Sequence, residues 1–302
     1  MEERKKPQVL LLGNGLNRAY AGNDWSGLIK AILQNPKVTF ETIKDMPFPL
    51  QAVIASDDHV DRAIKDHKEA FLGAENIESM RPSAERILSI PFDHILTTNY
   101  SYELERVADP GISRSGEECA KIMAHTEKVD RAETKYLLHT YNTVGFNGHI
   151  HKIWHIHGEA RKAQSIMLGH YYYGKLLGKY QKELEESENK QYKRQREGKP
   201  ILQDSWLDAF IMGDVYVLGF GFDFSEMDLW WLLNRKKREK AAHGRVFFYE
   251  PSYGNELKGS LLEVYDGKVI DLGFRTKMND AGYQSFYDAA IDHIGRTVKK
   301  NQ

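Results

Sequence analysis

The stretch Val9-Leu10-Leu11-Leu12-Gly13-Asn14-Gly15-Leu16-Asn17 decides the fold of this chain. Four consecutive apolar residues predict a strand covered on both faces, as in a parallel sheet. The glycines predict a tight turn into a helix, where no Cβ keeps a ligand away from the backbone. Such a turn brings backbone N–H groups up to a phosphate. Arg18 stands where the dinucleotide pattern G-x-G-x-x-G has its third glycine, so an ordinary strand–helix turn is the alternative interpretation.

Two further polar motifs follow apolar runs, Thr97-Thr98-Asn99-Tyr100 and His155-Ile156-His157-Gly158. Ligands bind at the carboxyl ends of strands in open α/β sheets, so we expect Asn99 and His157 to approach the glycine turn. An asparagine amide can hold a ribose hydroxyl and a water at once, although asparagine is also common as a cap at strand–helix junctions. His157 could exchange a proton near neutral pH. His155 has the same direction on a strand and is the alternative acid–base group.

A fourth motif, Leu218-Gly219-Phe220-Gly221-Phe222, is followed by Ser225 and Asp228. Hydroxyl and carboxylate groups after a strand can hold an adenosine ribose. The same residues could instead cap a helix, and Ser225 is the expected N-cap of a helix running to about Lys240. Gly219, Gly221, Ser225 and Asp228 are therefore candidate ligand contacts.

The pattern along the whole chain predicts an α/β fold: a Rossmann-like parallel sheet with helices on both faces and a small helical insertion. Strands are expected at 8–13, 94–98, 152–157, 165–168, 215–219 and 245–249. Helices are expected at 25–34, within 47–86, at 82–90, 100–106, 171–198, 202–212, 225–240 and 279–299. We expect one domain over residues 1–302, with an inserted module near 111–150 and a charged, solvated helix near 171–198.

The composition of 302 residues, with 41% hydrophobic residues and a net charge of −1, indicates a globular protein without a global basic field. No apolar run is long enough to cross a bilayer, and the charged start is unlike a signal peptide, so we expect a cytoplasmic protein without membrane contact. The basic run Lys193-Arg194-Gln195-Arg196 is short and mixed with acids, which favours a solvated face over direct nucleic-acid binding.

The order and content of the four motifs resemble the sirtuin (SIR2) superfamily, and more closely the SIR2-like NAD-consuming effectors of bacterial anti-phage defence. The family's glycine loop corresponds to residues 13–17, and its downstream Trp-x-x-Leu to Trp25 and Leu28. Its asparagine motif corresponds to Thr97-Thr98-Asn99-Tyr100, and its histidine motif to His157-Gly158, with Glu159 following as in the defence branch. Ser101 stands where the family usually has Asp.

The resemblance implies an NAD⁺ glycohydrolase that releases nicotinamide and ADP-ribose, with NAD as substrate. Asn99 would orient ribose and water, and His157 would be the acid–base group. The implied NAD contacts are Gly13, Asn14, Gly15, Leu16, Asn17, Arg18, Thr98, Ser101, Gly219, Gly221, Ser225 and Asp228. Deacylating sirtuins generally hold a zinc in a ribbon with four cysteines, whereas this chain has only Cys119, so neither a zinc ribbon nor a metal is expected. The stripe of histidines 149, 151, 155 and 157 suggests a metal site as an alternative, but metal sites usually have carboxylate or thiolate ligands and a closed geometry, so none is expected here.

A toxic NAD hydrolase must be restrained, so the resemblance implies the effector of an abortive-infection system, a homo-oligomer activated with a co-encoded sensor protein. Two alternatives remain open from the sequence. The chain could be a silent NAD- or ADP-ribose-binding module, which the exchange at Ser101 allows. It could also be a protein deacylase or ADP-ribosyltransferase, although the missing cysteines argue against a deacylase.

Overall fold

The computed structural model describes residues 6–22, 24–116, 133–197, 199, 203–239, 244–251 and 256–301. Within them lies a seven-stranded sheet with the order β3-β4-β2-β1-β5-β6-β7. All pairings are parallel except β3 with β4, which form an antiparallel hairpin at one edge. The strands are β1 (Gln8–Leu12), β2 (His94–Thr97), β3 (Asn142–Phe146), β4 (His149–His155), β5 (Asp214–Leu218), β6 (Val246–Tyr249) and β7 (Gly267–Val269).

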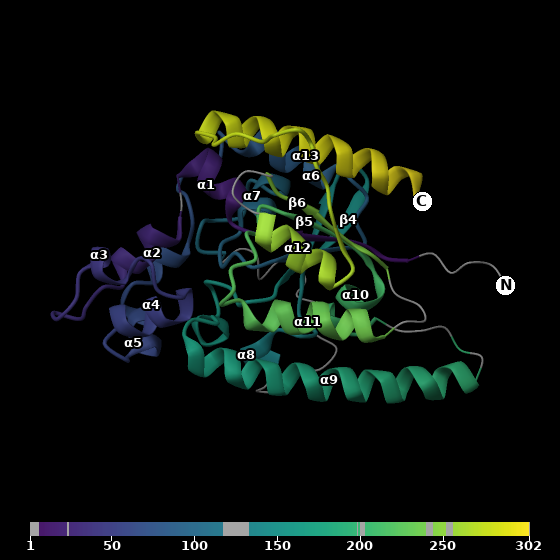
Figure 1. The fold of residues 1–302 in the computed structure, drawn as a ribbon, viewed down its shortest axis with the longest axis horizontal. Helices are drawn as coiled ribbons and strands as arrows, with labels where there is room; N and C mark the ends of the chain where they lie inside the picture. Colours follow the sequence, from purple (N-terminus) through teal and green to yellow (C-terminus); the bar gives the residue numbers. More distant parts are fainter. Residues whose placement is uncertain are drawn as a thin grey trace.

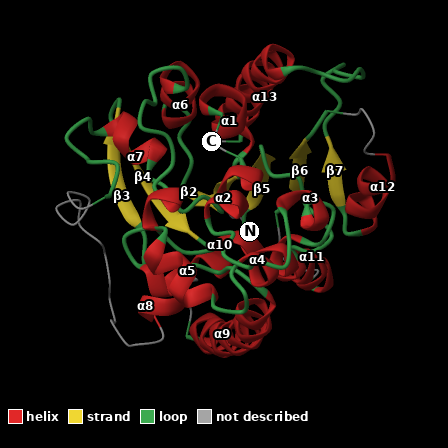
Figure 2. Cartoon of the chain, turned by 90° about the vertical axis from the view of Figure 1, so that its left-hand side faces the viewer, coloured by secondary structure: helices red, strands yellow, loops and turns green. Residues whose placement is uncertain are grey.

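Helices cover both faces of the sheet (Figures 1 and 2). One layer holds α1 (Gly15–Ala21), α6 (Arg81–Leu88), α7 (Glu103–Ala108) and α13 (Asp280–Lys300). The other holds α8 (Glu133–Tyr136), α9 (His170–Arg196), α10 (Trp206–Met212) and α11 (Met227–Arg238). α12 (Glu256–Val264) packs beside β7.

A small helical group lies between β1 and β2 in the sequence and extends from one end of the molecule, at the left of Figure 1. It consists of α2 (Trp25–Ala31), α3 (Phe40–Ile43), α4 (Phe48–Ala55), α5 (Val60–Asp66) and the 3₁₀ turn η1 (Lys68–Phe71). A second 3₁₀ turn, η3 (Ala163–Ser165), follows β4. The group contacts the rest of the molecule through α4 with α9 and through α5 with η3.

The apolar run of β1 serves both faces of the sheet. Val9 and Leu11 belong to the core beneath α9, α10 and α11, whereas Leu10 and Leu12 belong to the core beneath α6 and α13. All four side chains are at most 3% exposed. A central parallel strand must be apolar at every position for this reason, which is why the sequence shows no alternation there.

The strand order places the topological switch point between β1 and β5. The chain passes from β1 to β2 on one side of β1, and later returns to β5 on its other side. The register aligns Leu12 with both Thr97 and Leu218, and Thr97 with His155. The carboxyl ends of β4, β2, β1 and β5 therefore lie at one level, the place where open α/β sheets bind ligands.

The expected fold class is confirmed: an α/β protein with a mostly parallel, Rossmann-like sheet and a single cysteine. That cysteine, Cys119, lies outside the described residues, as does much of the module expected near 111–150. At the end of that range the chain forms β3, whose pairing with β4 makes it part of the main sheet.

Other expectations are corrected. The strand expected at 165–168 is the end of η3 and a buried loop, because its backbone pairs with no neighbouring strand. Ser225 is not a helix N-cap, since α11 begins at Met227 after Glu226. Helix α9 is not simply solvated, because Tyr173, Leu176 and Tyr180 in its first half are buried.

None of the described helices is long and apolar enough to span a membrane.

Candidate functional site

A cavity of about 740 Å³ opens at the carboxyl ends of the central strands. This volume falls within the ~300–1,000 Å³ typical of sites for small molecules and cofactors. Nine of the residues expected at the site line it: Asn14, Gly15, Arg18, Thr98, Asn99, Ser101, His157, Gly219 and Gly221. The other five, Gly13, Leu16, Asn17, Ser225 and Asp228, do not line it.

The glycine turn is packed against the loop that follows β5. The Gly13 N–H donates to the Leu218 carbonyl at 3.0 Å, and the Gly15 N–H donates to the Gly219 carbonyl at 2.8 Å. A Cβ on Gly13 would lie 2.4 Å from the Gly219 oxygen, closer than real atoms approach. Glycine is therefore required here for close contact across the switch point, whereas Leu16 and Asn17 face the core.

Arg18 brings a cation to the cavity wall. Its guanidinium stacks 4.5 Å from the centre of the Tyr283 ring and lies 3.8 Å from the exposed Asp280 carboxylate. Guanidinium groups are well suited to phosphate, and an exposed ion pair of this length is weak enough to be exchanged for one.

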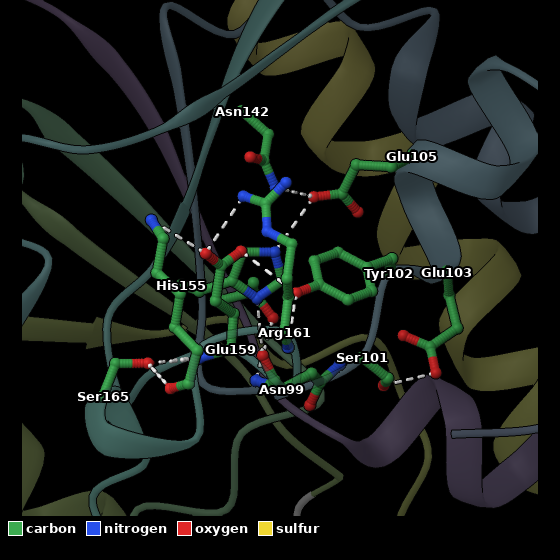
Figure 3. Close-up of polar contacts among 12 residues, drawn as sticks. Asn99, Ser101, Tyr102, Glu103, Glu105, Asn142, His155, Glu159, Arg161 and Ser165 are labelled. Atoms are coloured by element: carbon green, nitrogen blue, oxygen red, sulfur yellow. Dashed lines mark hydrogen bonds and ion pairs between the residues drawn. The ribbon is translucent and has the colours of Figure 1, made fainter. Parts of the chain in front are cut away.

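Asn99 lies two residues beyond the end of β2, where it lines the cavity and its backbone is fixed. Its N–H donates to Thr97 Oγ1 at 3.1 Å, and its carbonyl accepts a hydrogen bond from His155 Nδ1 at 2.8 Å (Figure 3). The side-chain amide has no hydrogen bond to any other described residue, so both its donor and its acceptor are available to a ligand.

His155 belongs to the buried support behind Asn99. A backbone carbonyl can only accept, so Nδ1 donates to Asn99, while Nε2 donates to the Glu105 carboxylate at 2.9 Å. Asn142 holds the same Glu105 oxygen at 2.9 Å. Burial lowers the pKa of His155, but the attraction of Glu105 prevails and raises it to about 9. With both nitrogens donating, this imidazolium has no site left to take a proton.

His157 faces a different environment from His155, because β4 ends at His155 and the strand alternation stops there. Its Nε2 lies 2.9 Å from Asp228 Oδ2, and its ring meets the Tyr173 ring edge-on at 5.8 Å. Nδ1 has no hydrogen-bond partner among the described residues, and the side chain lines the cavity. Burial lowers the pKa of His157, but the Asp228 and Glu226 carboxylates outweigh it and raise the pKa above its ordinary value.

Ser101, at the position where an acid was expected, is linked to one. Its hydroxyl donates to Glu103 Oε1 at 2.5 Å, and Glu103 is 4% exposed. Burial raises the pKa of Glu103. Gly73 packs on this pair with a φ of +71°, and a Cβ there would lie 2.2 Å from the Glu103 oxygen. Glu103 does not line the cavity, so its carboxyl group stands directly behind Ser101. Figure 3 shows the hydrogen bond between the two side chains.

Glu159, which follows the histidine motif, is structural. It accepts from Tyr102 Oη at 3.1 Å, pairs with Arg161 and Lys162 at 3.2 and 3.0 Å, and is 2% exposed (Figure 3). These contacts tie the loop after β4 to the residue that precedes α7.

Several lining residues were missed from the sequence. Glu250 directly follows β6, so the strand-end rule could have identified it; Lys258 Nζ lies 3.3 Å from its carboxylate and 2.5 Å from the Gly221 carbonyl. Tyr173 and Glu226, joined by a hydrogen bond of 3.1 Å, also line the cavity. Nothing local marks Tyr173, because the charged pattern of its helix indicated solvent.

His157, Glu226 and Asp228 are, within the part of the chain that the structure describes, the group spaced for a metal ion, with ligand atoms within 4.8 Å of one another. The same three side chains can instead share protons through hydrogen bonds. The Nε2–Oδ2 distance of 2.9 Å is a hydrogen bond, and Tyr173 donates to Glu226.

No protein-family model matches the chain, and no curated protein matches it either. The function must therefore be inferred from the motifs and from the cavity that brings them together.

Proposed function

We propose that this protein hydrolyses NAD⁺ to nicotinamide and ADP-ribose. One observation carries the proposal: the Asn99 amide, the His157 imidazole and the glycine turn reach one cavity from three neighbouring strand ends at the switch point of a Rossmann-like sheet. The motif of each group predicts its place at the carboxyl end of a strand. The resemblance of those motifs to SIR2-like effectors supplies the reaction.

The reaction breaks the bond between the nicotinamide nitrogen and ribose C1′, and its electron pair leaves with neutral nicotinamide. The Asn99 amide holds a ribose hydroxyl and a water, and the water oxygen then bonds to C1′. The unpartnered Nδ1 of His157 takes the proton released in that step and returns it to solvent. Preorganised dipoles around the oxocarbenium-like transition state, in a site that excludes other water, provide the rate enhancement.

The phosphates lie along the glycine turn in this proposal, within reach of Arg18, and the adenosine half lies towards Gly219 and Gly221. Ser225, which is half-buried, and the buried Asp228 do not line the cavity, so they support that loop instead of contacting NAD. Ser225 donates its N–H and hydroxyl to Asp223 at 2.8 and 2.6 Å, which stabilises the turn before α11. Ser101, backed by Glu103, serves where the family has an aspartate.

In its biological role, we propose a cytoplasmic effector of an abortive-infection system, which assembles with itself and is released by a co-encoded sensor. No metal takes part. The resemblance and the toxicity of NAD loss support this role, and the long helix α9 offers a surface for a partner.

The direct test is incubation of the purified chain with NAD⁺, alone and with the proteins encoded beside its gene, followed by chromatography of the products. Nicotinamide and ADP-ribose in equal amounts are expected, with none from the double variant Asn99→Ala/His157→Ala. Saturable NAD⁺ binding without products would identify a silent binding module. Acetyl-ADP-ribose from an acetylated peptide, or a labelled protein, would identify a deacylase or a transferase.

A further inference from the structure

The carboxylate of Asp228 is buried directly behind the candidate acid–base histidine. Asp228 is 0% exposed and stands at the start of α11, and its Oδ2 accepts from His157 Nε2 at 2.9 Å. Tyr180 of α9 places its hydroxyl 3.5 Å from the same oxygen. The motif at 218–228 predicts that Asp228 contacts ribose. This prediction is wrong, because the side chain has no exposed surface and does not line the cavity.

We propose that Asp228 is a positioning residue that keeps the proton of neutral His157 on Nε2 and thereby presents a bare Nδ1 to the cavity. As an account of catalysis this rests on the proposed NAD⁺ hydrolysis, while the tautomer itself does not. A carboxylate can only accept, so the hydrogen bond requires Nε2–H. The third member of a nucleophile–base–acid triad orients its histidine by the same logic.

Glu226, the second carboxyl group beside His157, differs from Asp228 in its position. Glu226 lines the cavity and accepts from Tyr173 Oη at 3.1 Å. Burial raises the pKa of Glu226 to about 7, with His157 opposing and Asp228 adding to the rise. It can therefore be protonated near neutral pH, whereas the hydrogen bond from His157 keeps Asp228 as the acceptor.

The titratable groups around His157 and its two neighbouring carboxyls come from three elements. Asp228, Glu226 and Asp223 belong to α11 and its preceding loop, Tyr173 and Tyr180 to α9, and Tyr100 to the segment after β2. The tyrosines are buried, which raises the pKa of each above its ordinary value, so they stay neutral donors. The charge that His157 experiences is thus set by the carboxyls alone.

A divalent cation is the competing occupant, since Asp228 Oδ1 is buried without a hydrogen-bond partner among the described residues and the three ligand atoms are closely spaced. A metal on Nε2 would require that nitrogen to give up its proton and its bond to Asp228. The observed Nε2–Oδ2 hydrogen bond favours the proton.

The tautomer can be measured without any substrate. Protein labelled with ¹⁵N-histidine is titrated, and the His157 nitrogen signals are assigned by their loss in His157→Gln. Above its pKa, wild-type His157 is expected to show protonated Nε2 and bare Nδ1. In Asp228→Asn the side-chain amide can donate to Nε2, so we expect the opposite tautomer and a protonation constant of His157 lowered by about tenfold.

The kinetic counterpart uses NAD⁺ as substrate. Asp228→Asn is expected to lower kcat by at least ~10²-fold, with KM within about threefold, because the residue does not touch the substrate. Asp208→Asn is the matched control. Like Asp228, Asp208 is buried and does not line the cavity, but its carboxylate completes the capping box of α10 with Ser205 and has no contact with His157. The substitution should lower thermal stability and leave the His157 signals unchanged.

A protonated Nδ1 in neutral wild-type His157 overturns the proposal, and this measurement does not depend on whether Asp228→Asn folds. Unchanged His157 signals in a folded Asp228→Asn protein also overturn it. So does one equivalent of Mg²⁺, Mn²⁺ or Zn²⁺ bound in wild type and lost in Asp228→Asn. If the tautomer is as expected but wild type makes no nicotinamide under any condition, the hydrolase proposal fails and the positioning of His157 stands.

Discussion

The backbone carbonyl of Asn99 lies 2.8 Å from Nδ1 of His155, so the loop after β2 is fastened to the last residue of the neighbouring strand β4. His155 is in turn held by Glu105, and both side chains are 2% exposed. The hydrogen bond fixes the backbone from which the Asn99 amide reaches into the cavity. One of the two strand-end histidines thus supports the site, and the other faces it.

The buried pair of His155 and Glu105 predicts a pH dependence of stability. The pKa of His155 is about 9 in the folded protein, above the ~6.5 of an unfolded imidazole. A raised pKa stabilises the fold fully below pH ~6.5, and this contribution is lost as the pH rises through about 9. Urea unfolding should therefore show a falling free energy between these values, and a flatter profile in Glu105→Gln. Equal slopes for the two proteins would show that the pair does not carry the proton.

The two histidines should respond differently to substitution. Both substitutions should lower the melting temperature, since each leaves a buried carboxylate, Asp228 or Glu105, without its partner. In the folded proteins, His157→Ala should lower NAD⁺ hydrolysis by ~10²–10⁴-fold because its Nδ1 acts in the cavity, whereas the rate should fall far less in His155→Ala. His149→Ala, on the exposed start of β4, is the control for both. Near wild-type turnover in His157→Ala would move the acid–base role away from this residue.

The pair of Ser101 and Glu103 should act as one unit. Ser101→Ala removes the hydroxyl that links the buried carboxyl to the cavity, and Glu103→Gln removes the carboxyl itself. If Glu103 acts only through Ser101, the double variant should have the same kcat/KM as the single variant with the lower kcat/KM. Additive losses in the double variant would show that the two residues act independently.

Gly13 should tolerate no side chain. In Gly13→Ala the new Cβ would lie 2.4 Å from the Gly219 oxygen and 2.6 Å from the Phe220 Cα, both backbone atoms, so the loop after β5 must move. We expect a loss of stability of about 1–3 kcal/mol and weaker NAD⁺ binding in calorimetry. Gly174→Ala is the matched control, because a Cβ there meets nothing within 4 Å. Equal stability and affinity in Gly13→Ala would remove the close-contact argument.

The projecting end of α9 is the candidate surface for a partner. The helix cannot simply be removed, because Tyr173 lines the cavity and the Ser187 hydroxyl donates to Asp208 at 2.5 Å. Charge reversal of exposed residues is therefore a cleaner test than deletion. Lys193→Glu/Arg196→Glu should leave NAD⁺ affinity unchanged and impair assembly, measured by light scattering with and without neighbour-encoded proteins. Lys299→Glu/Lys300→Glu on α13 is the control, and identical assembly in both pairs would exclude the α9 surface.

The sequence by itself predicted the strands β1, β2, β4, β5 and β6 and the level of the site, but it missed β3 and β7 at the two edges of the sheet. Fully apolar runs such as 9–12 and 215–218 occur where a strand is covered on both faces, and a polar residue directly after such a run lies at the ligand-binding edge. This local rule placed Asn99, His157 and the glycine turn correctly around one cavity. The same rule, applied to β6, would have added Glu250.

Only the tertiary structure decided which polar groups touch the cavity and which stand behind it. His155 and His157 look equivalent in a strand pattern, yet β4 ends between them, and each meets a carboxylate distant in the sequence, Glu105 or Asp228. Tyr173 reaches the site from a helix whose charges predicted solvent. Such pairings depend on how separate elements pack against each other, and the spacing of residues along one element carries no information about them.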